Sequence, residues 1–340
     1  MEKTALESNA AAMVAPSKGI LAADESSGTI KKRFDKIRLE STFESRRAYR
    51  ELLFTAPGAE KHISGVILYD ETIRQKASDG RPFPELLAAR GILPGIKVDA
   101  GAKALAGFPG ETITEGLDGL RERLAEYRGM GARFAKWRAV IDIGGGIPTG
   151  FAIEANAHAL ARYSALCQEA SIVPIVEPEV LMDGDHTIER CEEVTDAALT
   201  AVFDALFLHR VHLEGIVLKP NMVIAGKKCA VQAAPQQVAD ATLRCLRRRV
   251  PAAVPGIAFL SGGQSEADAT LHLSLMNRGG KLPWQLSFSY GRALQQSTLD
   301  AWRGEASNVT AAQKTFLRRA RLNGLARSGA YEAAMEQAAA

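Results

Sequence analysis

The sequence predicts an α/β fold of the (β/α)8 class, the TIM barrel, with extra helices at its C-terminal end. Short β-like runs alternate with longer helical patterns, and eight such runs can be found. They lie about 30 to 45 residues apart, which leaves room for a crossover helix after each one. No composition break marks a linker, so we expect residues 1–340 to form one barrel domain, with loose termini at 1–14 and 330–340.

Each expected strand is a short apolar run bounded by turn residues. The strands are expected at 19–24, 65–69, 95–98, 134–141, 172–177, 215–219, 257–260 and 285–289. Between them, apolar residues at helical spacing predict helices at 42–53, 117–128, 154–169, 186–207, 235–249 and 265–276. Two further helices, at 292–302 and 311–325, follow the last strand and should pack outside the barrel.

Composition and charge exclude several classes of function. A net charge of +3 without a basic run argues against nucleic acid, and no apolar run approaches the roughly 20 residues that cross a membrane. Four dispersed cysteines argue against a zinc site and a disulfide framework, and together with the absence of a secretory signal they indicate the cytoplasm. The histidines lack metal-ligand spacing, and no Gly-x-Gly-x-x-Gly follows a strand, so we expect neither a metal nor another cofactor.

The segment 213–221, Leu-Glu-Gly-Ile-Val-Leu-Lys-Pro-Asn, places Lys219 at the end of an apolar strand. Proline cannot donate to a sheet ladder, so the strand should end at this lysine. One interpretation is an ammonium that extends into water. The other is a buried, neutral amine that attacks a carbonyl. This segment alone favours the first interpretation, and the rest of the chain favours the second.

Charged side chains end other strands at the barrel face where active sites form. Residues two apart share a strand face, so Lys136 lies with Arg138, and Glu177 lies with Glu179. Strands four, five and six should be neighbours, which predicts that Lys136, Glu177 and Lys219 converge at the barrel mouth. A purely structural ion-pair network is the alternative.

These groups suit the chemistry of an imine. Burial and a neighbouring cation both favour a neutral amine, and Lys136 is the candidate cation. Glu177 has the chemistry to transfer protons while a carbinolamine loses water. Asp24, at the end of the first strand, could take a proton from a substrate hydroxyl, which is the step that breaks a carbon–carbon bond in a retro-aldol reaction.

The ends of the seventh and eighth strands are typical of anion sites. The turn Ser-Gly-Gly-Gln at 261–264 precedes a helix, so backbone amides and the helix N-terminus can face a phosphate. Ser289, Gly291 and Arg292 add a hydroxyl, an amide and a guanidinium. The segment 24–33 could hold a second anion, which would indicate a substrate phosphorylated at both ends. Ordinary turns at helix starts and a capped loop are the alternatives.

Seven ordered motifs resemble class I fructose-bisphosphate aldolases, the metal-independent type that works through a Schiff base. The similarity runs from about Ala15 to Tyr331, with motifs at 19–28, 95–99, 134–138, 175–179, 213–222, 259–266 and 288–295. The resemblance implies reversible cleavage of fructose 1,6-bisphosphate to dihydroxyacetone phosphate and glyceraldehyde 3-phosphate through a lysine imine, in glycolysis and gluconeogenesis. It also implies a cytoplasmic homotetramer that needs no cofactor.

The resemblance also implies roles for individual residues. Lys219 would form the imine, and Glu177 would accept and donate protons with support from Glu179. Asp24 would deprotonate the hydroxyl beside the scissile bond, and Lys136 would position the substrate and favour the neutral amine. The phosphate next to the imine would be held by Ser261, Gly262, Gly263, Ser289, Gly291 and Arg292, and the other phosphate by Arg33, Ser26, Lys97 and Arg138.

The sequence departs from animal members of that family at two places. Animal members end in a mobile tail with a terminal tyrosine that aids proton exchange on the enamine, whereas the last tyrosine here is Tyr331. Glu177 or water would then take that role, or the step would be slower. Ala100 stands where animal members often have lysine, so the site of the other phosphate should be less cationic. A lysine aldolase for another phosphorylated ketose, and a scaffold that binds filaments or partners, remain alternatives.

Overall fold

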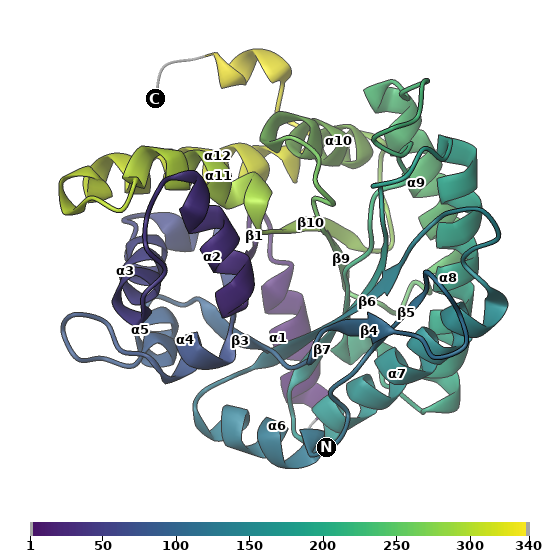
Figure 1. Ribbon diagram of the computed structural model, residues 1–340, viewed down its shortest axis with the longest axis horizontal. Coiled ribbons are helices and arrows are strands. Elements are labelled where there is room, and N and C mark those ends of the chain that lie inside the picture. Colours follow the sequence, from purple (N-terminus) through teal and green to yellow (C-terminus); the bar gives the residue numbers. More distant parts are fainter. Residues whose placement is uncertain (1–2, 338–340) are drawn as a thin grey trace.

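The computed structural model describes residues 3–337 and has a closed barrel of parallel strands at its centre (Figure 1). The strands follow one another around the barrel in chain order, and the last pairs with the first. This confirms the predicted fold, and all eight expected strands are found. They are β1 (Gly19–Ala23), β2 (Ile63–Leu68), β3 (Leu93–Lys97), β6 (Phe134–Ile141), β7 (Val173–Val180), β8 (Val217–Leu218), β9 (Gly256–Phe259) and β10 (Gln285–Tyr290).

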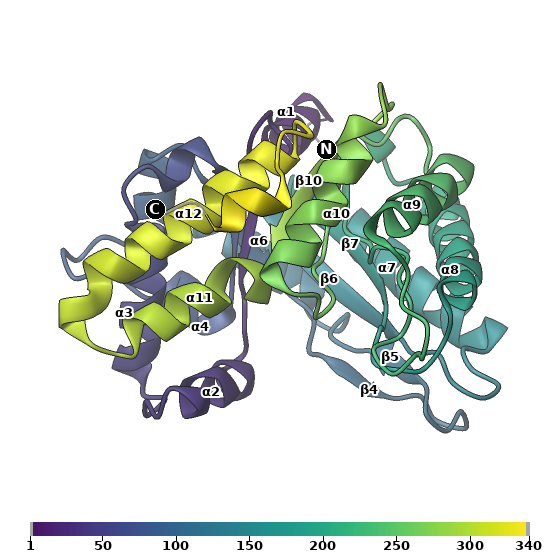
Figure 2. The same cartoon turned by 90° about the horizontal axis from the view of Figure 1, so that it is seen from above.

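Helices surround the barrel, and those expected from the sequence are present. In chain order they are α2 (Ser27–Lys36), α3 (Phe43–Phe54), α4 (Asp70–Arg74), α5 (Phe83–Ala89), α6 (Leu120–Gly129), α7 (Gly150–Glu169), α8 (Ile188–Leu208), α9 (Pro235–Arg249) and α10 (Glu266–Arg278). After β10, α11 (Arg292–Trp302) and α12 (Val309–Ala326) lie side by side outside the barrel (Figure 2). None of the helices described in residues 3–337 has the length and apolarity to cross a membrane.

Apolar side chains fill the barrel interior below the mouth, and Phe134 is the aromatic residue among them. A Cβ on Gly95 would lie 2.2 Å from Cε2 of Phe134, so the ring of Phe134 occupies the space that any other residue at position 95 would need. Ile20, Ile67 and Val173 from other strands are buried in the same cluster. This apolar layer places the polar side chains at the C-terminal ends of the strands.

The expectation of a loose terminus at 1–14 is wrong for the described residues. Residues 3–13 form helix α1 (Lys3–Met13), in which Leu6, Ala10 and Met13 are buried. Their spacing puts all three on one helix face, and that face packs into the interior cluster at the N-terminal end of the barrel. The helix therefore closes the end of the barrel opposite the mouth. Residues 1–2 lie outside the described part.

The expected loose tail at 330–340 is also wrong as far as it is described. Tyr331 is fully buried, and its hydroxyl donates to Oε1 of Glu336 at 2.8 Å. Glu336 lies in the short 3-10 helix η4 (Ala333–Glu336) and pairs with Arg319 of α12 at 2.5 Å. These contacts hold residues 331–336 against the protein. Residues 338–340 lie outside the described residues.

β7 runs three residues past its expected end and includes Pro178. The amide of Lys219 donates to the carbonyl of Val176 at 2.8 Å, and the amide of Val180 donates to Oδ1 of Asn221 at 3.1 Å. The alternate residues of β7 therefore face β8, which already ends at Leu218. Pro178 has no N–H to donate on that side, and it lies beyond the part of β7 that pairs with Val217 and Leu218.

A hairpin that the sequence did not predict stands beside the barrel mouth. It pairs β4 (Ala102–Ala104) with β5 (Thr112–Thr114) in antiparallel order. The hydroxyl of Thr112 donates to the carbonyl of Val140 at 2.9 Å, and that of Thr114 donates to the carbonyl of Arg138 at 2.7 Å. These side-chain hydrogen bonds hold β5, and through it β4, against β6. Each of the two strands has three residues, which is too short to show an alternation of apolar and polar residues in the sequence.

Candidate active site

A cavity of about 610 Å³ opens at the C-terminal ends of the strands. Every site residue that the sequence predicts lines this cavity, which confirms that they lie together, although their roles stay predictions. They are Asp24, Ser26, Arg33, Lys97, Lys136, Arg138, Glu177, Glu179, Lys219, Ser261, Gly262, Gly263, Ser289, Gly291 and Arg292.

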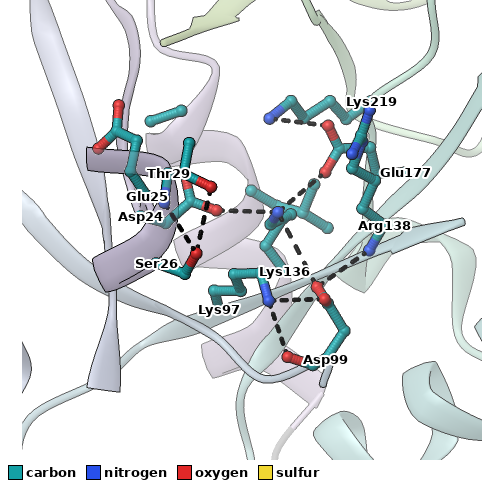
Figure 3. A network of polar contacts seen from close by, with 12 residues as sticks. Asp24, Glu25, Ser26, Thr29, Lys97, Asp99, Lys136, Arg138, Glu177 and Lys219 are labelled. Carbon is teal, nitrogen blue, oxygen red and sulfur yellow. Dashed lines mark hydrogen bonds and ion pairs between the residues drawn. The ribbon is translucent and has the colours of Figure 1, made fainter. Parts of the chain in front are cut away.

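Lys219 is buried rather than extended into water. The residue is 4% exposed, and its Nζ lies 3.1 Å from Oε1 of Glu177 (Figure 3). The backbone bond to Val176 fixes the lysine at the end of β8, directly beside β7. The interpretation of an ammonium extending into solvent is therefore wrong.

Lys136 is the centre of the charged network, as Figure 3 shows. Its Nζ lies 2.8 Å from Oδ2 of Asp24, 3.4 Å from Oε2 of Glu177 and 3.9 Å from Oδ2 of Asp99. Glu177 thus stands between two lysines, one at each carboxylate oxygen. Strand order predicts this convergence, and the geometry confirms it.

The network fixes the charges of two of its members. Burial raises the pKa of Asp24, but Lys136, Lys219 and Lys97 outweigh that effect and hold this pKa well below its usual range. Burial lowers the pKa of Lys136, but Asp24, Glu177 and Asp99 outweigh it and raise this pKa well above its usual range. At neutral pH the site therefore contains an aspartate anion in contact with a lysine cation.

Glu179 is held by a different partner from Glu177. It forms an ion pair with Arg138, which lies on the neighbouring strand β6. Burial lowers the pKa of Arg138, but Glu179 and other carboxylates more than compensate and raise it above its usual range. Glu179 lies two residues after Glu177 and shares its strand face, and the ion pair with Arg138 holds it there.

One side of the cavity is built to accept an anion. Gly262 and Gly263 have φ values of +56° and +86°, which favour glycine and turn the chain before α10. On the neighbouring strand β10, Ser289 is 1% exposed, and its Oγ has no hydrogen-bond partner among residues 3–337. A buried hydroxyl without a partner is costly, so a ligand oxygen at this place would satisfy it. Arg292 begins α11 beside it.

Cations and hydroxyls also line the opposite side. Nζ of Lys97 lies 2.6 Å from Oδ1 of Asp99, and Oγ of Ser26 lies 3.1 Å from Oγ1 of Thr29 at the start of α2. Arg33, expected with this group, pairs with Glu25, and its Nη2 lies 3.6 Å from a Cβ built on Gly291. Arg33 thus lies next to the turn assigned to the phosphate beside the imine.

Asp99, Glu25 and Lys227 line the cavity although the sequence argument gave them no role. Asp99 could have been found, because it lies two residues after Lys97 and so shares its face. Glu25 pairs with Arg33 and with the buried Arg50. Arg50 lies 25 residues further along the chain, so no local sequence pattern predicts its pairing with Glu25. Lys227 lies in a loop without regular structure, where no periodicity applies.

Tyr331, the last tyrosine of the chain, does not line the cavity. Its hydroxyl is bonded to Glu336 and the residue is fully buried. Glu177 therefore remains the nearest protonating group to Lys219 within the described site.

Comparison with known proteins gives matches over nearly the whole chain. The family model described as fructose-bisphosphate aldolase class-I matches residues 5–340. A probable fructose-bisphosphate aldolase class 1 of Xanthomonas campestris pv. campestris is 59% identical over 328 residues, which cover 96% of this chain and 98% of that protein. The cytoplasmic isozyme of fructose-bisphosphate aldolase from Spinacia oleracea is 56% identical, with 96% and 92% covered.

A solved structure also matches the fold of this chain over nearly its whole length. The fructose-bisphosphate aldolase of Plasmodium falciparum, crystallised with TRAP and a small-molecule inhibitor, gives a TM-score of 0.96 at 51% identity. The match covers 97% of this chain and 95% of that one.

Proposed function

The chain belongs to the class I fructose-bisphosphate aldolase family, and on this premise we propose that Lys219 is the lysine through which it acts. The enzyme cleaves fructose 1,6-bisphosphate reversibly to dihydroxyacetone phosphate and glyceraldehyde 3-phosphate through a lysine imine, in glycolysis. The observation that carries the assignment is the buried Nζ of Lys219, 3.1 Å from a Glu177 carboxylate whose other oxygen faces Lys136.

The imine would form in two steps. The neutral amine of Lys219 attacks the ketose carbonyl carbon, and the carbinolamine then loses water to give the protonated imine. Glu177 is within reach to take the proton that the attacking amine releases and to donate the proton that leaves with water. Glu179, which lies on the same strand face as Glu177 and is paired with Arg138, would support this proton transfer.

Cleavage would use Asp24 as the proton acceptor. Asp24 takes the proton from the hydroxyl on the carbon beyond the scissile bond, and that oxygen forms the aldehyde as the carbon–carbon bond breaks. The electron pair of the broken bond moves to the imine nitrogen and gives an enamine, so atoms and charge balance. The ammonium of Lys136, 2.8 Å from Asp24, holds the carboxylate ionised and in place for this step.

The two phosphates would occupy opposite sides of the cavity. Support for the phosphate beside the imine comes from the orphaned Oγ of Ser289 and the positive-φ turn at Gly262 and Gly263, next to Arg292. Ser26, Lys97 and Arg138, which also line the cavity, would hold the other phosphate. Arg33, which the resemblance assigns to the other phosphate, lies next to Gly291 and so would contact the phosphate beside the imine.

The test is trapping of the imine. Reduction with borohydride in the presence of dihydroxyacetone phosphate should attach the substrate carbons to Lys219, as located by peptide mass spectrometry. Lys219→Met should give no adduct, whereas Lys228→Met, which changes an exposed lysine nearby, should give the wild-type adduct. An adduct that persists at another lysine in Lys219→Met would overturn the assignment.

We also propose that the enzyme works as a homotetramer in the cytoplasm. The relatives from Spinacia oleracea and Arabidopsis thaliana carry cytoplasmic or cytosolic names, which supports the location. Phe207 and Leu208, at the end of α8, are 81% and 76% exposed, and an apolar pair of this kind suits burial between subunits. Light scattering after gel filtration should give four chain masses, and a single chain mass would contradict the tetramer.

A further inference from the structure

Lys227 is a cation of the cavity wall that the mechanism above does not use. Its Nζ lies 3.0 Å from Oδ1 of Asp183, and its side chain is 39% exposed. A Cβ built on Gly263 would lie 2.6 Å from Nζ of Lys227 and 3.0 Å from Nη2 of Arg292. The ammonium and the guanidinium therefore lie over the same glycine turn.

Backbone hydrogen bonds hold Lys227 at this place although it lies outside the regular strands. The amide of Lys227 donates to the carbonyl of Met182 at 2.7 Å, and the amide of Lys228 donates to that of Gly184 at 3.0 Å. The amide of Gly226 donates to the carbonyl of His186 at 2.8 Å. These bonds tie the loop after β8 to the loop after β7, so the backbone of Lys227 is held at the rim of the cavity.

We propose that Lys227 is a further substrate-binding residue, which contacts the phosphate next to the imine, and that Asp183 holds its ammonium until that phosphate arrives. The proposal rests on the proposed function, because it takes the turn at Gly263 together with Arg292 as the site of this phosphate. A phosphate carries more negative charge than a carboxylate and accepts the same charge-assisted hydrogen bond. The lysine side chain is flexible and carries its charge on one atom, so the ammonium of Lys227 can leave Asp183 and bind the phosphate.

The neighbouring Lys228 provides a matched control. It is also exposed and follows in the same loop, but it does not line the cavity. A loss of positive charge near the mouth would affect both variants, whereas direct contact with the phosphate would affect Lys227 alone.

Steady-state kinetics with fructose 1-phosphate and fructose 1,6-bisphosphate test the proposal, because both carry the phosphate beside the reacting carbonyl. Lys227→Ala should raise KM for both about fivefold, with kcat nearly unchanged, since a half-exposed charge pair contributes modestly. Lys227→Arg should recover most of the loss, and Lys228→Ala should behave as wild type. An unchanged KM in Lys227→Ala, or a rise for the bisphosphate alone, would overturn the proposal.

The role of Asp183 is tested in the same assay. Asp183→Asn should lower KM by about twofold, because the carboxylate no longer competes with the phosphate, and the change should vanish when combined with Lys227→Ala. If Asp183→Asn lowered KM equally in the wild-type and Lys227→Ala proteins, the proposed exchange of Lys227 between Asp183 and the phosphate would be wrong. Borohydride trapping tests the role of Lys219 separately from the phosphate contact of Lys227. The Lys227→Ala variant should still trap dihydroxyacetone phosphate at Lys219. An adduct at another lysine would contradict the proposed function and would leave the phosphate contact untouched.

Discussion

Three carboxylates lie among three lysines inside the barrel mouth, and Lys136 contacts all three of the acids. Asp24, Asp99 and Glu177 face Lys136, while Lys97 and Lys219 each pair with one of the same acids. Charges that are buried in this way depend on one another, because removing one partner leaves another unpaired. Since these acids and lysines are already paired with one another, we expect the two phosphates of the substrate to be bound by the additional cations that line the cavity.

Asp24 should make stability depend on pH. Its folded-state pKa lies below the unfolded value of about 3.9, so its contribution is complete above that pH and is lost as the pH falls through the folded pKa. Asp24→Asn should lower the free energy of unfolding by about 2 kcal/mol at pH 7, and the difference from wild type should shrink below about pH 3.9.

Urea unfolding between pH 7 and pH 3 measures this difference. Asp300→Asn makes the same chemical change at an exposed position of α11 and should stay within about 0.5 kcal/mol of wild type at each pH. A difference for Asp24→Asn that does not change with pH would contradict the charge argument.

At the scale of elements, β8 has two residues, and beyond its end the side chain of Asn221 takes over the hydrogen bonding to β7. Oδ1 of Asn221 accepts from the amide of Val180 on β7, and its Nδ2 donates to Oγ1 of Thr195 on α8 at 3.0 Å. The same Nδ2 donates to the carbonyl of Met222 at 3.1 Å. One amide side chain thus joins β7, the end of β8 and α8 two residues after Lys219.

Asn221→Ala should destabilise the protein by about 2 to 3 kcal/mol, because the buried N–H of Val180 and the hydroxyl of Thr195 lose their partner. It should also lower kcat, since the end of β8 carries Lys219. Asn277→Ala removes one bond from a half-buried asparagine of α10 and should change neither quantity by much. Equal unfolding free energies for the two variants would rule out the bridging role.

At the scale of the whole molecule, stability and chemistry are placed at opposite ends of the barrel. Helix α1 inserts Leu6, Ala10 and Met13 at the N-terminal end, while the charged cavity opens at the C-terminal end. Apolar layers that include Phe134 and Ile175 lie between them. A change in the packing of α1 should therefore alter stability without altering substrate binding.

Leu6→Ala should lower the free energy of unfolding by about 2 to 5 kcal/mol, because it leaves a cavity at a fully buried position. KM for fructose 1,6-bisphosphate should stay at the wild-type value at a temperature where both proteins are folded. Ser8→Ala, on the exposed face of the same helix, serves as the control for urea unfolding. A large rise in KM for Leu6→Ala would show that the two ends of the barrel are coupled.

Removal of metal ions should leave the activity of the whole enzyme unchanged, because class I aldolases work through a lysine imine. The proposed mechanism uses only side chains of this chain, with Lys219 in the role that a metal ion would otherwise fill. Turnover of fructose 1,6-bisphosphate after dialysis against EDTA should equal that before dialysis. Loss of activity that zinc or another divalent ion restores would contradict the imine mechanism.

The sequence by itself determined the alternation of strands and helices, the strand whose end carries Lys219, and the convergence of Lys136, Glu177 and Lys219 at the barrel mouth. It could do so because strand faces, helical spacing and turn residues are local properties of the chain, and parallel strands bring their C-terminal ends together. Only the tertiary structure decided which acid faces which lysine, that Arg33 lies beside Gly291, and that Lys227 reaches the turn at Gly263. It also decided that residues 3–13 are packed rather than loose, because their apolar face finds its partner only at the closed end of the barrel. Such contacts join residues far apart in the chain, and their geometry depends on barrel closure and loop pairing, for which no local pattern exists.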